Sequence, residues 1–456
     1  MSVEKGGRSL DSFVDTICGG YLEKNKFDPE LYEKFQVHRG LRNPDGSGVL
    51  AGVTRIGSVQ GAVLRDGERI PIEGRLYYRG IEINDLIGGF EREGRLGFEE
   101  IAYLLLTGEL PKASQLEEFK GVLSELYALP DGFTENMILK APSRDIMNKL
   151  ARSLLALYSY DAEPDGCSAR NLMRQSIELI ARIPLIVSHA YAVKSHYFDN
   201  RSLVLHRPQE HLSIAENLLH TLRHDSSYTD EEARILDMCL VLHAEHGGGN
   251  NSAFSARVLS SSGTDTYSAM SAAVGSLKGP RHGGANLKVM GMLDEIMANV
   301  RDWNDRDEIS AYLGRMLDKR AGDGSGLIYG MGHAVYTLSD PRAVILSAKA
   351  AKMAEGRGMS GEYGLIKNVA ELAPGEFYKR HGTAKVIGAN VDLFSGFIYK
   401  MCDIPSELFT PVFAVARMVG WCAHRIEERL FGGRIIRPAY RSISPERKYV
   451  LLSDRD

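Results

Sequence analysis

The chain has 456 residues, 44% of them hydrophobic and 25% charged, which is an ordinary composition for a globular protein long enough to form two domains. Its formal net charge of −4 gives no overall attraction for nucleic acid or for anionic membranes, so binding of an anionic ligand would need a local concentration of positive charge. The chain has no run of 18 apolar residues, so no membrane span is expected.

The amino-terminal 20 residues mix Lys5 and Arg8 with acidic residues and lack an apolar core, so no targeting signal is predicted there. The five cysteines are scattered and include no CxxC pair. Together these features predict a protein of the reducing cytoplasm.

One region near the amino end is predicted to form β-structure. Residues 52–80 carry β-branched residues on both sides of a turn signal at Asp66-Gly67, which predicts a small hairpin. Nearly all of the later sequence has helical periodicity, so the predicted fold class is all-α with one hairpin.

A helix with a clear beginning precedes the segment His243-Ala244-Glu245-His246-Gly247. Thr229 and Glu232 have the spacing of a capping box, and Ile235, Cys239, Leu242 and His246 fall on one apolar face. The pattern predicts that His246 points inward from the last helical turn, before three glycines end the helix. Either a buried core histidine or a site residue fits this placement.

A second histidine stands between two chain-breaking signals, in Lys278-Gly279-Pro280-Arg281-His282-Gly283-Gly284. Gly-Pro ends one helix, and the two glycines open the next, so His282 is displayed in a loop where backbone and ligand approach closely. The amides at the start of the following helix favour an anion nearby. The alternative is a loop histidine that only caps a helix.

Five further contexts follow along the chain. Gly330-Met331-Gly332-His333 contains a third loop histidine, and Asp340-Pro341-Arg342 has the form of a helix start with an arginine in its first turn. Asp392 precedes an apolar helical run. It either caps this helix or serves as an accessible carboxylate at the start of it. Arg417 lies inside an apolar helix, where it needs a bound carboxylate or a neighbouring acid, and Arg437 lies near the carboxyl end. A structural salt bridge or a solvated surface charge is the alternative for each arginine.

These motifs, in this order, resemble the citrate synthase family, and the resemblance runs from Tyr77 to Arg437. It implies a two-domain helical fold: residues 1–282 and 398–456 form a large domain, and residues 283–397 form a small domain between them. The resemblance also implies a homodimer whose substrates are oxaloacetate and an acyl-coenzyme A, with no further cofactor, no nucleic acid and no membrane partner.

The roles of individual residues also follow from the resemblance. Asp392 is the base that removes a proton from the acetyl methyl group, His282 donates a hydrogen bond to the thioester oxygen, and His333 polarises the ketone of oxaloacetate. The expected oxaloacetate ligands are His246, Arg342 and Arg417, with Arg437 entering the site of the partner subunit. The expected coenzyme A contacts are Lys278, Gly330, Met331 and Gly332.

The chain departs from the family pattern at three positions. Glu245 stands where members commonly have aspartate, Gly247 stands where they have glutamate, and Thr337 replaces a basic residue that meets coenzyme A phosphates. The expected activity is citrate synthase, and the alternatives are a 2-methylcitrate synthase that uses propionyl-coenzyme A and a non-catalytic regulatory homologue. A metal site formed by His243, His246 and Asp392 is disfavoured by its spacing, so no metal is expected.

Overall fold

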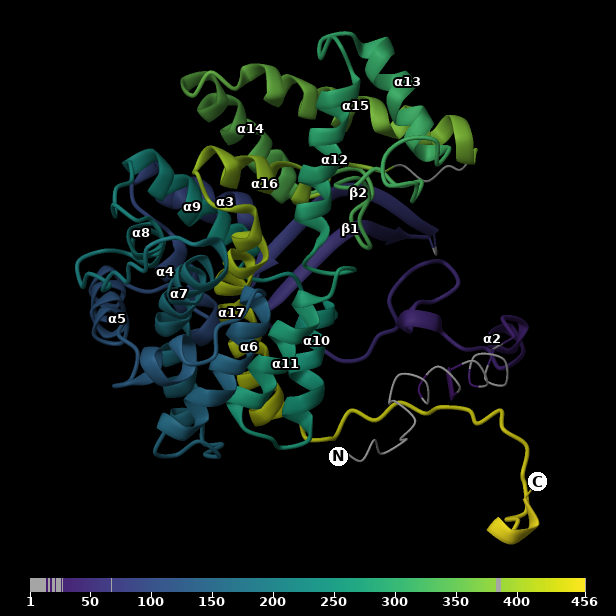
Figure 1. Ribbon diagram of the computed structural model, residues 1–456, viewed down its shortest axis with the longest axis horizontal. Coiled ribbons are helices and arrows are strands. Elements are labelled where there is room, and N and C mark those ends of the chain that lie inside the picture. Colours follow the sequence, from purple (N-terminus) through teal and green to yellow (C-terminus); the bar gives the residue numbers. More distant parts are fainter. Residues whose placement is uncertain are drawn as a thin grey trace, which may run out of the picture. The chain divides into compact units, whose positions relative to one another are not determined.

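A computed structural model describes residues 28–66, 68–382 and 387–455 and a few single residues before them (Figure 1). Contacts divide the chain into two compact units, Met1–Ala51 with Arg437–Asp456, and Gly52–Ile436. In the first unit, α2 (Glu30–Lys34) is a short helix. The guanidinium of Arg441 lies 5.4 Å from the ring centroid of Phe35, which joins the two segments of this unit.

The second unit is mainly helical, with a small sheet near its beginning. Its strands are β1 (Gly57–Arg65), β2 (Glu68–Tyr78) and β3 (Ile81–Glu82). Its helices are α3 (Ile83–Arg92), α4 (Phe98–Thr107), α5 (Ala113–Glu125), α6 (Ile146–Leu157), α7 (Ala169–Asp199), α8 (Ile214–Leu222), α9 (Asp230–His243), α10 (Asn251–Ser261), α11 (Thr266–Lys278), α12 (Ala285–Asn299), α13 (Arg306–Leu317), α14 (Pro341–Gly356), α15 (Ser360–His381), α16 (Asp392–Met401) and α17 (Phe409–Glu427).

The predicted hairpin is confirmed as the antiparallel pair β1 and β2, and the predicted all-α fold class is confirmed with it. The pairing shifts register between Gln60 and Ala62. A short third strand, β3, which the sequence did not predict, adds to the edge of β2. Of the predicted turn, Gly67 lies outside the described residues.

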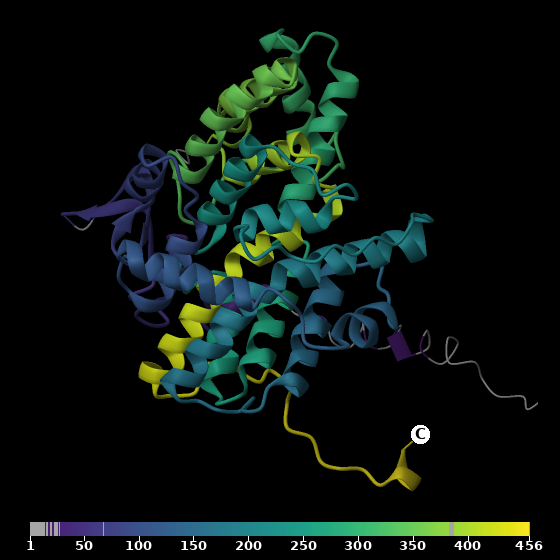
Figure 2. The same ribbon diagram turned by 90° about the vertical axis from the view of Figure 1, so that its left-hand side faces the viewer.

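Helix α17 is the centre of the larger group of helices. It packs against α4, α6, α7, α9, α10 and α11, and Figure 2 shows it running through the helical body. The burial pattern explains this position, because the stretch from Phe409 to Arg425 is buried on nearly every face. Any side chain that α17 directs toward the loops is therefore held by a rigid, fully packed support.

A second group consists of α12 to α16, with close packing of α13 on α15, α14 on α16 and α12 on α16. Figure 1 shows these helices gathered on one side of the hairpin. The predicted domain boundary at residue 282 falls just before α12, and the one at residue 397 falls inside α16; both stay predictions.

Among the described residues, α7 is the one helix long and apolar enough to suit a membrane span. In the structure 78% of its most apolar window is buried within the protein. Its apolar length is thus accounted for by core packing against α5, α6, α8 and α17.

Candidate active site

The loop that follows α9 holds His246, but not in the way the helical pattern predicted. Thr229 and Glu232 do form the predicted capping box, with Glu232 Oε2 accepting from the Thr229 amide at 2.8 Å. The helix, however, ends at His243, so the prediction that His246 lies in its last turn was wrong. The helix ends early because Tyr78 competes for its terminal carbonyls: the phenol donates to Val241 O at 2.9 Å.

His246 is nevertheless buried, with 8% of its surface exposed. Burial and the nearby charge of Arg342 hold its pKa well below the usual value, so the ring is neutral at pH 7. Its Nε2 has no hydrogen-bond partner among the described residues. A buried polar nitrogen without a partner is costly, which points to a ligand at this position.

The loop that carries His282 is fixed by the first turn of α17. Thr410 Oγ1 donates to Gly283 O at 2.9 Å, and a Cβ at Gly283 would lie 2.3 Å from Leu277 O, so a side chain has no room there. His282 Nε2 lies 3.1 Å from Ser252 Oγ, which also accepts from Trp421 Nε1 at 3.1 Å. Burial, with the charge of Arg417, lowers the pKa of His282 to about 4, so this ring is also neutral.

The His333 loop is shaped by its own backbone and by the hairpin. The Val335 and Tyr336 amides donate to His333 Nδ1 at 3.0 and 3.1 Å, so in the neutral ring the proton is on Nε2. A Cβ at Gly61 would lie 2.2 Å from Val335 O, and one at Gly74 would lie 2.2 Å from Ser339 O. The hairpin therefore approaches this loop backbone to backbone, which only glycine permits.

Arg342 occupies the first turn of α14, as the Asp340-Pro341 signal predicted. Asp340 caps this helix and also accepts two bonds from the guanidinium, at 3.0 Å to Nε and 2.8 Å to Nη2. Burial opposes the charge, but Asp340 raises the pKa of Arg342 above its usual value. The arginine is thus a fixed, fully ionised cation, with Tyr336 as its aromatic neighbour at 5.8 Å.

Asp392 begins α16 but does not cap it. Asn390 accepts the Asp392 amide at 3.0 Å, and α16 has no side-chain cap at Val391, the residue before it. The cap hypothesis for Asp392 was therefore wrong, because Asn390, two residues earlier, performs that role. Burial raises the pKa of Asp392 to about 6, although Arg342 and Arg417 oppose the rise.

Arg417 lies one turn after Phe413, as predicted, with its guanidinium 4.7 Å from the ring centroid. Only 1% of its surface is exposed, and its Nε donates to His243 O at 2.5 Å. Within the part of the chain that the structure describes, it forms no salt bridge and Nη1 has no partner. A buried cation with an unused donor is suited to an anionic ligand.

These residues meet at one place in the second unit. The rings of His246, His333 and Tyr336 form a cluster with centroid separations of 5.0, 5.5 and 4.7 Å. The Tyr336 hydroxyl also lacks a hydrogen-bond partner in the described chain. Three buried groups here lack a hydrogen-bond partner in the described chain: a neutral imidazole nitrogen on His246, a hydroxyl on Tyr336 and a guanidinium nitrogen on Arg417.

The other candidate residues are described by their own surroundings. Lys278 is 43% exposed at the side chain and pairs with Asp145 at 3.3 Å. The backbone of Gly330 to Gly332 pairs with residues 388–390, for example through Gly332 N and Gly388 O at 2.7 Å. Arg437 is exposed and belongs to the first unit. Among the described residues, no group of acidic, histidine or cysteine side chains is arranged to hold a metal ion.

The sequence predictions missed several residues that shape this site. Tyr78 holds the end of α9, Ser252 and Trp421 contact His282, and Tyr336 joins the ring cluster. A signal existed for Tyr336, which stands three residues after His333, and for Trp421, which lies four residues after Arg417 on the same helical face. Ser252 gave no comparable signal.

Comparison with known proteins was made for the whole chain. The family described as citrate synthase, C-terminal domain, matches residues 45–439. A citrate synthase of Synechocystis sp. is 33% identical over 417 residues, which cover 90% of this chain and 93% of that protein. A 2-methylcitrate synthase of Shewanella oneidensis is 31% identical over 382 residues, which cover 83% and 92%.

A solved structure of the ternary complex of citrate synthase from Thermoplasma acidophilum with carboxymethyl coenzyme A and oxaloacetate has a TM-score of 0.74 and 26% identity. The match covers 92% of this chain and 99% of that chain. The predicted resemblance is confirmed by these matches and by the fold. This chain belongs to the citrate synthase family and is an acyltransferase of that family.

Proposed function

We propose that the protein condenses oxaloacetate with acetyl-coenzyme A and water, giving citrate and free coenzyme A. The observation that carries this proposal is the set of buried, unpartnered polar atoms on His246, Tyr336 and Arg417 beside the His333 ring. A compact dicarboxylate with a ketone supplies the groups that this set lacks, and the thioester substrate makes a separate cofactor unnecessary.

Oxaloacetate binding is assigned to both cations and to His246. Arg417 Nη1 and the ionised Arg342 suit the two carboxylates, because guanidinium groups pair with carboxylates through parallel hydrogen bonds. His246 Nε2 suits a polar oxygen of the same molecule. Arg437 is proposed to complete the site of a partner subunit, in a homodimer.

Enolisation is assigned to Asp392 and His282. The Asp392 carboxylate takes a proton from the acetyl methyl group while neutral His282 donates a hydrogen bond to the thioester oxygen. We assign the donor to Nδ1. This tautomer leaves Nε2 as an acceptor for the Ser252 hydroxyl at 3.1 Å, and it requires that hydroxyl to turn its one proton away from Asn250 Oδ1, to which it donates at 2.8 Å, while its oxygen still accepts from Trp421. The pKa of Asp392 at about 6 makes it a stronger base than a solvated aspartate.

Carbon–carbon bond formation is assigned to His333. The enolate carbon attacks the ketone carbon of oxaloacetate, the carbon–oxygen π bond opens, and the oxygen takes the Nε2 proton of His333 to become the hydroxyl of the product. The proton that Asp392 took from the methyl group returns to the ring through water. Water then attacks the thioester carbonyl of the product, the carbon–sulfur bond breaks, and coenzyme A leaves as the thiol. Each of the three reacting side chains is present, which argues against a regulatory homologue.

Coenzyme A is proposed to contact Lys278 and the backbone of Gly330, Met331 and Gly332. Thr337 does not supply the basic group expected four residues after His333, and its hydroxyl donates instead to Gly61 O at 3.5 Å. The five free cysteines fit the expected reducing cytoplasm. We also keep the division at residues 282 and 397 as the proposed boundary between the two domains that enclose the substrates.

The first prediction tests the reacting residues. Asp392→Asn removes the base with little change of shape, and His282→Ala removes the donor to the thioester oxygen. Each substitution should lower kcat by at least about 10²-fold in an assay of free thiol. Arg441→Ala, in the first unit, is the control and should keep normal kcat. Near-normal turnover in either site variant would contradict the role given to that residue.

A second candidate, the use of propionyl-coenzyme A, is favoured by the 2-methylcitrate synthase among the relatives. Leu393 is fully buried next to Asp392, and its side chain lies against Gly330, where a Cβ would be 3.0 Å away. A leucine there is compatible with either acyl group, because one methylene changes binding by only about 1–3 kcal/mol.

The second prediction concerns this choice of acyl group. At saturating oxaloacetate, kcat/KM should be measurable with both thioesters and larger for acetyl-coenzyme A. The two substrates are compared on one preparation. A propionyl value tenfold above the acetyl value would replace the citrate assignment by the methylcitrate one.

A further inference from the structure

Arg417 is a buried cation, and no acidic side chain in the described residues forms a hydrogen bond with it. Its Nε is used by the His243 carbonyl, and its Nη1 is unpartnered. No carboxylate in the described residues lies within salt-bridge distance of it. A guanidinium that is 1% exposed nevertheless needs a negative charge nearby.

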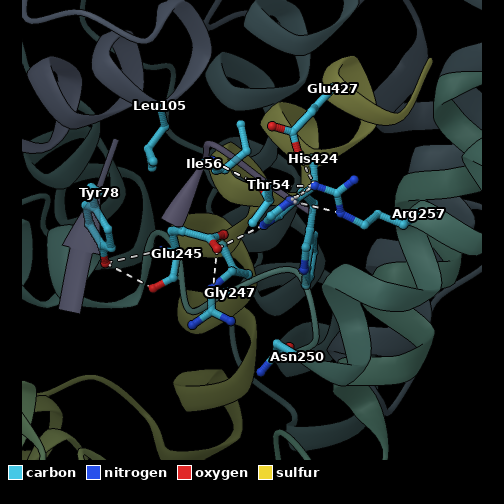
Figure 3. Close-up of polar contacts among 12 residues, drawn as sticks. Thr54, Ile56, Tyr78, Leu105, Glu245, Gly247, Asn250, Arg257, His424 and Glu427 are labelled. Atoms are coloured by element: carbon cyan, nitrogen blue, oxygen red, sulfur yellow. Dashed lines mark hydrogen bonds and ion pairs between the residues drawn. The ribbon is translucent and has the colours of Figure 1, made fainter. Parts of the chain in front are cut away.

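Glu245 is the acid that lies against the same face of α17. Its Oε1 accepts the Gly247 amide at 2.5 Å and His424 Nε2 at 2.9 Å, while Oε2 has no partner in the described chain (Figure 3). A Cβ at Gly420 would lie 2.5 Å from Glu245 Oε2. Gly420 follows Arg417 by three residues, so the free carboxylate oxygen borders the helical turn that carries the arginine.

The hydrogen bond from His424 holds the Glu245 carboxylate with Oε1 toward the histidine and Oε2 toward α17. Arg257 Nη2 lies 2.7 Å from His424 Nδ1, and since a guanidinium only donates, Nδ1 accepts and the ring proton is on Nε2, facing Glu245. Arg257 is held in turn by Glu428, at 2.8 Å, and by Glu427 and Thr54. Figure 3 shows this row of contacts ending at the turn that contains Gly247.

The electrostatic effects agree with the geometry. Burial lowers the pKa of Arg417 to about 10, and Glu245 is the largest influence that opposes this lowering. Burial also disfavours the Glu245 charge, but His424 and Arg417 together hold its pKa below the usual value. The two groups therefore favour each other's charged forms.

We propose that Glu245 is a positioning residue that serves as the fixed counter-charge of Arg417. His424 holds one carboxylate oxygen away, so that Arg417 stays charged while its Nη1 remains available for the substrate. Glu245 balances part of the positive charge of Arg417, so it also lowers the affinity of the site for an anion. A lower affinity favours release of the anionic product. The inference rests on the proposed function only in taking that anion to be oxaloacetate.

Glu245→Gln tests the charge separately from the hydrogen bonds. The amide oxygen can replace Oε1 and accept from both Gly247 and His424, so that these hydrogen bonds stay while the negative charge is lost and an amide NH2 takes the place of Oε2. The matched control is Glu232→Gln, which also removes the charge of a buried glutamate, in this case one that pairs with Arg223 near the start of α9.

The expected result is that Glu245→Gln lowers the oxaloacetate KM at least about threefold, because the substrate becomes the sole counter-charge of Arg417. The kcat should also fall, because citrate leaves more slowly. Glu232→Gln should leave the KM unchanged. A role limited to holding the loop would instead raise the KM of Glu245→Gln, and a raised or unchanged KM would overturn the proposal.

A stability cycle without any substrate supplies the second test. Glu245→Gln and Arg417→Met should each lower the Tm, by about 2 °C or more, whereas the double variant should recover part of the summed loss. If the single variant Glu245→Gln does not fold, the double variant should still fold, because the buried cation has then been removed as well. Losses that simply add, or a double variant that stays unfolded, would overturn the counter-charge. Absence of condensation by the wild type, with coupling intact, would count against the proposed function alone.

Discussion

Asp392 has its pKa set by opposing influences, and this has a measurable consequence. Burial raises the pKa to about 6, with the Asp340 charge in support, while Arg342 and Arg417 act in the other direction. His282, in contrast, has its pKa lowered to about 4 and stays neutral over the accessible range. Of these two groups, Asp392 is therefore the one whose protonation changes between pH 5 and 8.

The third prediction is an acidic limb in the pH profile. A base must be ionised, so kcat/KM for acetyl-coenzyme A at saturating oxaloacetate should fall as pH decreases through about 6, approaching tenfold per unit. Since the folded pKa is raised, protonation of Asp392 favours folding, and loss of this activity should not coincide with loss of structure. A circular dichroism spectrum at pH 5 provides the control. A flat profile from pH 8 to 5 would contradict the assignment of the base.

At this scale the sequence predicted residue identities better than residue environments. Arg342 was placed correctly because Asp340-Pro341 is a local signal, and the structure shows that cap. His246 was misplaced because the end of its helix depends on Tyr78, which lies 163 residues from Val241. The capping role considered for Asp392 was wrong because Asn390 accepts the helix amide instead. Local patterns do not contain such competition.

At the scale of elements, helix α4 begins on a carboxylate supplied by α9. Asp237 accepts the Gly97 amide at 2.7 Å and the Phe98 amide at 3.1 Å, and it is 2% exposed. Burial, together with the nearby Glu99, raises the pKa of Asp237 to about 8. Two helices that pack on α17 are therefore joined by a carboxyl group that is protonated at neutral pH.

The fourth prediction follows from this raised pKa. The folded state binds more protons than the unfolded chain between the ordinary aspartate pKa and about 8, so stability is lost as pH rises through 8. Asp237→Asn has no proton to lose, and its Tm relative to wild type should increase by about 2 °C or more from pH 7 to 9. The exposed Asp230→Asn on the same helix should show no such trend. A constant difference for Asp237→Asn would contradict the raised pKa.

The hairpin shows what element-scale prediction provided and what it lacked. Alternating β-branched residues around a turn signal predicted the two strands, because strand formation depends on local pattern and turn chemistry. No local pattern indicated that the hairpin supports the His333 loop. That contact joins Gly61 to residues nearly 280 positions later, and only the folded backbone brings them together.

At the scale of the whole molecule, Arg437 lies in the unit formed by the two chain ends, separate from the unit that holds the other candidate ligands. The proposed homodimer explains how it reaches an active site, because the carboxyl-terminal segment of one subunit would serve the other. This expectation came from the family resemblance alone. Neither helical periodicity nor the chemistry of a motif indicated it.

The fifth prediction is complementation between inactive chains. When Arg437→Ala is mixed with Asp392→Asn and subunits exchange, each heterodimer has one site with both residues intact. Roughly a quarter of wild-type activity should return in an equal mixture, since half of the dimers are mixed and each has one of two sites intact. A mixture of Asp392→Asn with His282→Ala is the control and should stay inactive, because both residues act within one chain. No recovery after confirmed exchange, or a fully active monomer, would argue against the shared site.

The close approach of Gly61 and Gly74 to the His333 loop also bears on which changes the protein tolerates over evolution. Neither glycine has a side chain to offer a substrate, yet a methyl group at either position would displace the loop backbone at Val335 or Ser339. In a library of every single substitution selected for growth on the activity, both positions should be depleted as strongly as a reacting residue. Intolerance at these positions would then show that the hairpin backbone determines the conformation of the His333 loop.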